Sequence, residues 1–370
     1  TMPKSATQKK PSSEDAPLYE CVPVNWLWLP KPIRIILGHI IVTTFSLTFL
    51  SVPISLIFIT PYMLRNYPIL CGVVIASLIM SMLVPLKEWE YARVLCQLTY
   101  ELYGVSCNLS PKDIEERIAL GQKGQYIIGM HPHGIVPIQA LIWCAYCDQY
   151  MSDGGPEAPS DKKMYGFGAA ADVVMYIPFL RNVMGWLSGG PASYKDLMDG
   201  LTKGKSPIVN RAGRTPKHLY ILPGGVAEVF TSTPGKDIIV FGKRRGLCRL
   251  ALETGANLFP CYVFGGTSFF NNLATGDGYL SKISRKMQMG LTIFYGHFGL
   301  PIPFTPRVTL CLGDAIEVKA VEGVKGEDGK VMIPQEAIEE LHEKYIQAIT
   351  DMFNRYKAAA GYPDAVLEVQ

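Results

Sequence analysis

The chain has 370 residues, of which 48% are hydrophobic and 18% charged, so it is more apolar than an ordinary soluble domain. This composition excludes a disordered chain, a collagen and a small disulfide scaffold. The formal net charge of +3 is too close to neutrality for a nucleic-acid-binding protein, and we expect no nucleic acid partner. Nine scattered cysteines, an odd number, favour reduced thiols in a cytosol-facing domain.

The N-terminal part of the chain predicts a polar tail followed by a membrane hairpin. The first residues combine Lys, Ser, Pro and acidic side chains, so we expect 1–34 to be a disordered or polar cytosolic tail. The stretches 40–61 and 67–86 contain no Asp, Glu, Lys, Arg or His, and each is near the ~20 residues that a helix needs to cross a bilayer. Because only 62–66 separates them, we expect a transmembrane or re-entrant helical hairpin over 35–86.

Basic residues around this hairpin predict its orientation. Lys31 and Arg34 precede the first apolar stretch, and Lys87 and Arg93 follow the second, whereas only Arg65 lies in the turn. The excess of positive charge on the flanks predicts that both termini face the cytosol. Two buried core helices, or a hairpin that dips into one leaflet, are the alternatives.

From residue 87 onward the pattern predicts one α/β domain, 87–370, with a mixed or mostly parallel sheet. An amphipathic helix is expected at 89–103, a second helix at 242–254 and surface loops at 152–163 and 322–330. Short apolar runs predict buried strands at 126–130, 219–223, 238–241, 258–264 and 308–312. A final helix starts at Pro334 and is ended by Gly361, and its apolar positions step by three and four: Ile338, Leu341, Tyr345, Ile349, Met352 and Tyr356.

The clearest chemical signal is the sequence GMHPHGI at 129–135, directly after the first predicted strand of this domain. A histidine at a strand end is well placed to act as a general base near neutral pH. Pro132 makes the backbone rigid there, and Gly134 lets a ligand approach closely. A lone histidine is more often structural, but His131 and His133 flanking a proline at a strand-to-loop junction favour a catalytic role.

A second glycine turn has the sequence LPGGVAE and occupies residues 222–228. Gly224 and Gly225 can direct backbone N–H groups at an oxyanion or a phosphate, and Glu228 can orient an imidazole and stabilise its protonated form. Taken alone, a β-turn with a solvated glutamate explains this segment equally well. Together with the paired histidines, the turn favours a functional site.

Five basic residues form a cluster at the start of the predicted helix 242–254: Lys236, Lys243, Arg244, Arg245 and Arg249. Basic side chains near a helix N-terminus favour the binding of phosphate groups. A solvated helix face, or contact with anionic lipid headgroups, is the alternative.

Other chemistries are disfavoured by the sequence. The two histidines with Cys144 and Cys147 imitate a zinc set, but the apolar stretch 138–144 suits a buried helix better, and we expect no metal. The chain has no G-x-S-x-G elbow, so a serine hydrolase is disfavoured.

The same residues resemble the type 2 diacylglycerol acyltransferase family, which also contains monoacylglycerol and wax-alcohol acyltransferases. The resemblance runs from the hairpin to the C-terminus. Three motifs carry it: YIIGMHPHGI at 126–135, GGVAE at 224–228 and GYPDAVLEV at 361–369. A block at the spacing of the family adds Arg244, Gly246, Ala251, Gly255, Pro260, Phe264 and Gly265.

This resemblance implies an acyl-CoA-dependent O-acyltransferase that moves a fatty acyl group to the free hydroxyl of diacylglycerol and makes triacylglycerol. It implies the endoplasmic reticulum membrane and the lipid-droplet surface as its location. His133 would take the proton of the acceptor, Glu228 would orient the ring, and His131 would support the arrangement. The residues expected to bind substrate are Pro132, Gly134, Gly224, Gly225, Lys243, Arg244, Arg245 and Arg249.

The implied partners are acyl-CoA, diacylglycerol or a related neutral lipid, and the membrane, with a homo-oligomer left open. No cofactor is implied, because acyl-CoA is a substrate. Transfer to monoacylglycerol or to a long-chain alcohol, which gives a wax ester, is the first alternative, and a panel of acceptors separates it. A non-catalytic lipid-binding membrane protein is the outside alternative, and such a protein would tolerate the loss of His133.

Overall fold

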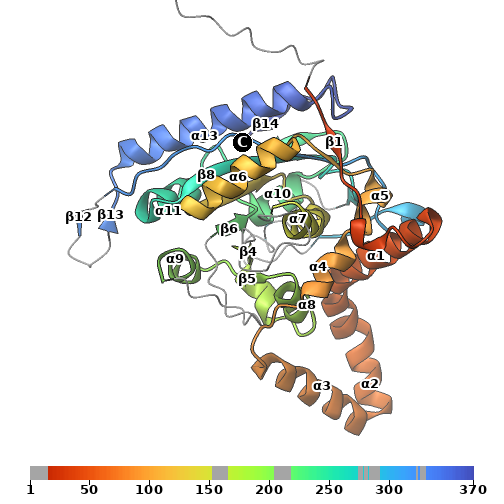
Figure 1. The fold of residues 1–370 in the computed structure, drawn as a ribbon. Helices are drawn as coiled ribbons and strands as arrows, with labels where there is room; N and C mark the ends of the chain where they lie inside the picture. Colours follow the sequence, from red (N-terminus) through yellow and green to blue (C-terminus); the bar gives the residue numbers. More distant parts are fainter. Residues whose placement is uncertain are drawn as a thin grey trace, which may run out of the picture.

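A computed structural model describes residues 16–151, 166–203, 218–273, 278, 282, 292–321, 324–325 and 331–370. At its centre lies an eight-stranded mixed sheet with the strand order β1-β2-β11-β8-β3-β6-β4-β5 (Figure 1). The β1–β2 and β11–β8 pairs are antiparallel, and the other neighbours are parallel. The strands are β1 (Tyr19–Glu20), β2 (Ser106–Cys107), β3 (Tyr126–His131), β4 (Gly166–Ala170), β5 (Gly189–Pro191), β6 (His218–Ile221), β8 (Asn257–Phe264) and β11 (Thr309–Leu312). The predicted α/β domain with a mixed sheet is confirmed.

Helices cover both faces of the sheet, so its central strands are buried on both sides. In β3, Ile127 packs into one core while Tyr126, Ile128 and Met130 pack into the other, because successive side chains of a strand point to opposite faces. The core that contains Ile127 is covered by α9 (Tyr194–Lys203), α11 (Gly246–Thr254) and α13 (Gln335–Tyr356). The opposite core is covered by α4 (Glu90–Cys96), α5 (Thr99–Tyr103), α6 (Pro111–Lys123) and α7 (Ile138–Gln149).

The predicted strands and helices exist, with shifts at their ends. The run 238–241 forms β7 (Asp237–Ile239), which pairs with β14 (Leu367–Val369) in a separate sheet and not in the main one. The helix predicted at 89–103 is broken into α4 and α5, and the helix expected from 242 begins at Gly246. The final helix ends at Tyr356, earlier than Gly361, and its six predicted apolar positions are all buried.

Short elements complete the fold. Among them are the helices α8 (Leu180–Trp186) and α10 (Gly225–Thr231) and the 3-10 turns η2 (Val24–Trp26), η6 (Asp172–Tyr176) and η7 (His297–Gly299). Two small antiparallel pairs are β9 (Asn271–Asn272) with β10 (Phe294–Tyr295) and β12 (Val324–Lys325) with β13 (Val331–Met332). The predicted loop 152–163 lies outside the described residues, as does most of 322–330.

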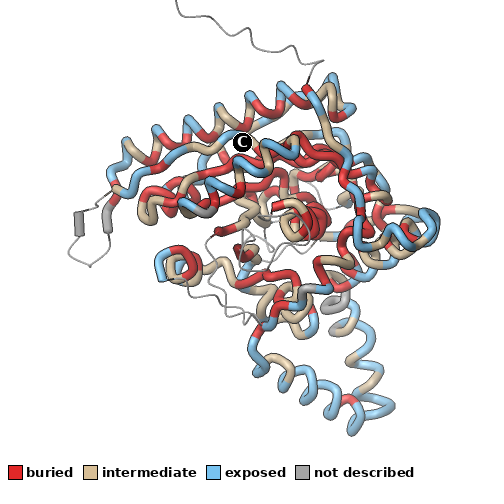
Figure 2. Tube along the Cα trace, viewed as in Figure 1, coloured by how far each residue is buried: buried red, intermediate tan, exposed pale blue. Residues whose placement is uncertain are grey.

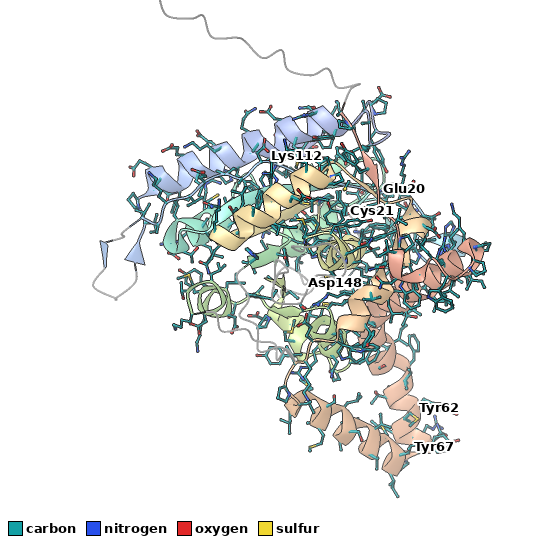
Figure 3. All side chains as sticks on the ribbon, in the orientation of Figure 1. Glu20, Cys21, Tyr62, Tyr67, Lys112 and Asp148 are labelled. Carbon is teal, nitrogen blue, oxygen red and sulfur yellow. The ribbon has the colours of Figure 1, made fainter. Side chains whose placement is uncertain are left out.

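The apolar N-terminal region is helical but differs from the predicted hairpin in its turn. It consists of α1 (Lys31–Ile54), the π-helical segment η3 (Ser55–Ile59), α2 (Thr60–Asn66) and α3 (Pro68–Leu83). Residues 62–66, predicted as the turn, are helical, and the chain changes direction at Tyr67, whose φ of −142° and ψ of 58° are not helical. Figure 3 shows Tyr62 and Tyr67 at this bend.

The segments α2 and α3 extend away from the body of the molecule and are largely exposed (Figure 2). Among the described residues, one helical stretch, Lys31–Leu50, is long and apolar enough to cross a membrane by length and composition alone, whereas the apolar helix α3 is shorter. The predicted tail also differs, because β1 joins the main sheet and α1 starts at Lys31, so the chain is ordered well before residue 34.

Candidate active site

His131, the last residue of β3, is completely buried in the core. Its Nδ1 lies 3.4 Å from Oε1 of Glu228, and its ring packs edge-on against Phe241 at 5.5 Å between centroids. Tyr345 of α13 lies 6.0 Å from the same ring and donates a hydrogen bond of 3.0 Å to the carbonyl of Gly129. His131 is therefore fixed by packing and by one carboxylate, and its side chain has no exposed surface.

Glu228, in the first turn of α10, joins three segments of the site. Its Oε2 accepts a hydrogen bond of 2.5 Å from the backbone N–H of His133, and its Oε1 accepts one of 2.9 Å from the N–H of Val240. Burial raises the pKa of this carboxyl, but the hydrogen bonds with His131 and with the two N–H groups outweigh burial and lower the pKa overall. Glu228 thus holds the main chain of His133 and the ring of His131, and not the ring of His133 as predicted.

Gly224 leaves the room that this carboxylate occupies. A Cβ atom at Gly224 would lie 1.8 Å from the carboxyl carbon of Glu228, so only glycine fits beneath the folded-back side chain. The backbone N–H of Gly225, predicted to point at an oxyanion or a phosphate, instead donates a hydrogen bond of 3.1 Å to the carbonyl of Leu222. These two glycines shape the turn around Glu228.

His133 lies two residues further along, on the loop between β3 and α7, and is half-buried. Its Nδ1 is 2.9 Å from the carbonyl of Gly134. Because a carbonyl can only accept, Nδ1 carries the proton and Nε2 keeps its lone pair. Gln139 of α7 fixes the loop by donating hydrogen bonds to the carbonyls of Pro132, at 2.8 Å, and of His133.

The environment of His133 favours its neutral form. Burial lowers the pKa of the imidazole, and the charge of Arg244 lowers it further, while the Gly134 carbonyl and Glu228 act in the opposite direction. With its pKa below the ordinary value of 6.5, His133 is neutral near pH 7. A neutral imidazole with a free Nε2 can accept a proton.

A cavity of about 430 Å³ adjoins His133. Its walls are mainly apolar and come from α1, α7, α8 and the strands β4 and β6. Among the predicted site residues, His133, Gly225 and Arg244 line it, whereas His131, Glu228, Pro132, Gly134 and Gly224 do not. Of the predicted catalytic residues, His133 lines this cavity, and His131 and Glu228 do not.

The predicted basic cluster is not assembled at this cavity. Of its five members Arg244 alone lines the cavity, and it donates a hydrogen bond of 3.2 Å to the carbonyl of Pro223, whereas Lys236 is exposed. Arg245 turns toward α13, where it pairs with Glu339 at 2.6 Å and lies 2.8 Å from Nε2 of His342. Arg249 pairs with Glu253 of its own helix at 3.2 Å, and Lys243 is exposed. The side chains diverge because residues 243–245 precede α11 on a turn.

The cavity wall contains a buried polar group that is not apparent from the sequence. Arg93 of α4 donates hydrogen bonds to Ser188, at 2.6 Å, and to Asp148 of α7, at 3.3 Å, and it forms an ion pair with Glu88. Arg93, Asp148 and Ser188 line the cavity. In the sequence, Arg93 stands out only as a basic residue that follows the predicted hairpin. Nothing in the spacing indicates its buried ion pair with Asp148, 55 residues further along the chain.

Two further supporting residues come from distant parts of the chain. Val240 reaches Glu228 because β7 is held beside β14, and the N–H of Gly242 donates a hydrogen bond of 2.7 Å to the carbonyl of Gln370. Helical spacing identified Tyr345 as a core residue but gave no sign of its contact with the strand of the histidines. The C-terminal segment thus takes part in building the site.

The family and the relatives that match this chain all carry the names of acyltransferases. A model of the family described as "Diacylglycerol acyltransferase" matches residues 62–370. "Diacylglycerol O-acyltransferase 2-like protein 6" of Mus musculus is 28% identical over 257 residues, which are 65% of this chain and 69% of the relative. "Diacylglycerol O-acyltransferase 1" of Schizosaccharomyces pombe is 27% identical over 68% of each chain.

A relative with a different printed name matches equally well. "2-acylglycerol O-acyltransferase 1" of Bos taurus is 27% identical over 254 residues, which are 65% of this chain and 67% of the relative. The family match covers far more than half of the chain and includes the β3 loop, the Glu228 turn and the C-terminal segment. The protein is therefore an acyltransferase enzyme and belongs to the diacylglycerol acyltransferase family.

Proposed function

We propose that this protein transfers a fatty acyl group from acyl-CoA to the free hydroxyl of diacylglycerol and so makes triacylglycerol. One observation carries the proposal: His133, with a free Nε2, faces an apolar cavity that suits lipid chains. The domain that performs this reaction spans residues 87–370.

In the proposed reaction His133 is the general base. Its Nε2 takes the proton of the acceptor hydroxyl while the oxygen attacks the thioester carbonyl. The resulting tetrahedral intermediate collapses, the C–S bond breaks, and His133 returns the proton to the departing coenzyme A thiolate. A thioester is already activated, so neither an acyl-enzyme nor a cofactor is needed. Glu228 and His131 act as positioning residues, since they fix the loop that carries His133.

Arg244 supplies positive charge next to His133, whereas the charge of Arg93 in the same wall is paired with Glu88 and Asp148. It lines the cavity and is close enough to His133 to affect the pKa of its imidazole, so it can stabilise the oxyanion of the intermediate or bind a phosphate of coenzyme A. We propose no such role for Arg245 and Arg249, whose side chains pair with Glu339 and Glu253. Lys243 is exposed and stays available for a phosphate.

A second acceptor class is supported by one observation. The relative named 2-acylglycerol O-acyltransferase matches as well as those named for diacylglycerol. The same chemistry at His133 can serve a monoacylglycerol or a long-chain alcohol, because the base acts only on the hydroxyl. Diacylglycerol remains the first proposal, since several similar relatives carry its name.

We also propose that α1 to α3 embed the enzyme in the endoplasmic reticulum membrane, with both termini in the cytosol, and allow it to reach lipid droplets. The exposed apolar side chains of this region support the proposal, because so large an apolar surface is unfavourable in water. Examples are Ile69, 84% exposed, Leu83, 72% exposed, and Phe58, 67% exposed.

The test is acyl transfer in microsomes from labelled acyl-CoA to diacylglycerol, monoacylglycerol and hexadecanol. Triacylglycerol as the main product supports the first proposal. A preference for monoacylglycerol or hexadecanol supports the second acceptor class instead. No product from any acceptor contradicts both and favours a lipid-binding protein.

A further inference from the structure

The buried group around Arg93 gives the mainly apolar cavity a charged part of its wall. Arg93 is 8% exposed, and it lines the cavity together with Asp148 and Ser188. Asp148 lies at the C-terminal end of α7, beside α4 (Figure 3). The backbone of Ser188 has a φ of 64°, in the left-handed region that favours glycine, and such strain is typical of functional sites. A charged side chain in an apolar wall costs free energy unless polar partners surround it.

The protein engages two of the three nitrogen atoms of the Arg93 guanidinium. Nε donates a hydrogen bond of 3.3 Å to Asp148, and Nη1 donates one of 2.6 Å to Ser188 and another to Glu88. Among the described residues, no hydrogen bond involves Nη2. A guanidinium has five N–H donors, so Nη2 keeps two of them for a ligand that carries acceptor oxygens.

The distance between this guanidinium and the loop of His133 suits an acylglycerol. Gln139, which binds the carbonyl of His133, and Asp148 lie nine residues apart on α7, which corresponds to about 13 Å along the helix axis. In an extended diacylglycerol, about 7 Å separates the free hydroxyl oxygen from the carbonyl oxygen of the more distant ester. A hydrogen bond of about 3 Å at each end brings the span to the same length.

From this arrangement we infer that Nη2 of Arg93 binds an ester carbonyl of the acceptor lipid while His133 acts on its hydroxyl. This inference rests on the proposed function. Two polar contacts orient the glycerol ester, and the apolar walls hold its chains. A long-chain alcohol has the hydroxyl but no ester, so it makes only one of these contacts. Arg93 thereby favours acylglycerols over long-chain alcohols.

An ether analogue tests this contact in the wild-type enzyme. The two acceptors are dipalmitoylglycerol and dihexadecylglycerol, which has the same chain length and the same hydroxyl but no carbonyl group, each in phosphatidylcholine vesicles. We expect the KM for the diether to be about tenfold higher, the effect of one hydrogen bond to a charged donor. Equal KM values for the two acceptors overturn the inference, and they are also the result expected if Arg93 contacts acyl-CoA instead.

Arg93→Lys shows whether Arg93 causes the preference for the diester. Lysine keeps the positive charge, but its three donors are engaged by Glu88, Asp148 and Ser188, so none remains for the ester. We expect the KM for the diester to rise about tenfold, to that of the diether, while the KM for the diether and for hexadecanol stays at the wild-type value. A tenfold preference that persists in this variant overturns the inference.

Arg117→Lys is the matched control. Arg117 also pairs with an aspartate, Asp314 at 2.7 Å, but does not line the cavity, so this variant keeps the tenfold preference. Should Arg93→Lys not fold, Arg93→Gln combined with Glu88→Gln, which removes a positive and a negative charge together, takes its place in the same comparison. The failure of the proposed function is distinct, because wild type would then make no triacylglycerol from dipalmitoylglycerol.

Discussion

Two histidines that are separated by a single proline occupy opposite environments in this molecule. His131 ends a buried strand and contacts Glu228, Phe241 and Tyr345, whereas His133 stands on the following loop and faces the cavity. One strand residue and one loop residue of the same motif are therefore assigned different roles in the proposed mechanism. His131 and Glu228 determine where the loop lies, and His133 carries the lone pair that can act on a substrate.

The largest effect is expected when His133 is removed. His133→Ala eliminates the base but leaves the buried pair intact, so kcat should fall by about 10²- to 10⁴-fold while the melting temperature stays near that of wild type. Microsomal acyl transfer at matched expression measures the first quantity and thermal unfolding in detergent the second. A variant that keeps wild-type kcat would remove His133 from the mechanism.

The opposite pattern is expected for His131. His131→Ala leaves a cavity in the core and a buried Glu228 without its imidazole partner, which should lower the free energy of unfolding by about 3 kcal/mol. At a temperature where the variant is folded, a substantial part of the activity should remain. Activity that is lost as completely as in His133→Ala, with unchanged stability, would contradict the division of roles.

A smaller, directional effect is expected for Arg244. Burial and the charge of Arg244 both lower the pKa of His133, and the base works only in its neutral form. Activity should therefore fall as the pH drops through this lowered pKa, below 6.5. Arg244→Gln removes one of the two causes, so the pKa of His133 rises and the acid limb of the pH–rate profile moves to higher pH. The KM for acyl-CoA should rise about tenfold.

The smallest effect is expected for Arg245, which follows Arg244 in the sequence but does not line the cavity. Arg245 pairs with Glu339 at the surface, and such exposed pairs contribute little to stability. Arg245→Gln should leave the KM for acyl-CoA and the pH profile as in wild type, which makes it the matched control for Arg244→Gln. An equal rise in the KM for acyl-CoA in both variants would contradict this distinction. It would support the predicted cluster, in which both arginines bind phosphate groups.

The sequence predicted most of this fold where local periodicity decides the structure. The buried strand before the histidines and the six inward positions of α13 follow from hydrophobic spacing alone. The bend in the apolar region was placed slightly too early, at 62–66, although the sequence carries a signal for its position. Pro68 begins α3 and disfavours helical backbone at the residue before it, so Tyr67 leaves the helix and α2 ends there.

The sequence predicted which residues form the candidate site better than it predicted the contacts between them. His131, His133 and Glu228 do come together, but sequence spacing cannot reveal that the carboxylate contacts the ring of His131 and the main chain of His133. The contacts of Val240 and Tyr345 depend on the pairing of β7 with β14 and on the docking of α13. Such long-range contacts leave no local pattern in the chain.

Chemical rescue tests the central claim most directly, because it separates a missing base from a damaged fold. Imidazole added to His133→Ala can occupy the space that the side chain leaves and supply the lost Nε2. We predict that it restores acyl transfer to diacylglycerol in His133→Ala, more so as the pH rises and free imidazole loses its proton, and that it has no effect on His131→Ala. Restored transfer in His131→Ala, with none in His133→Ala, would contradict the assignment of His133 as the base.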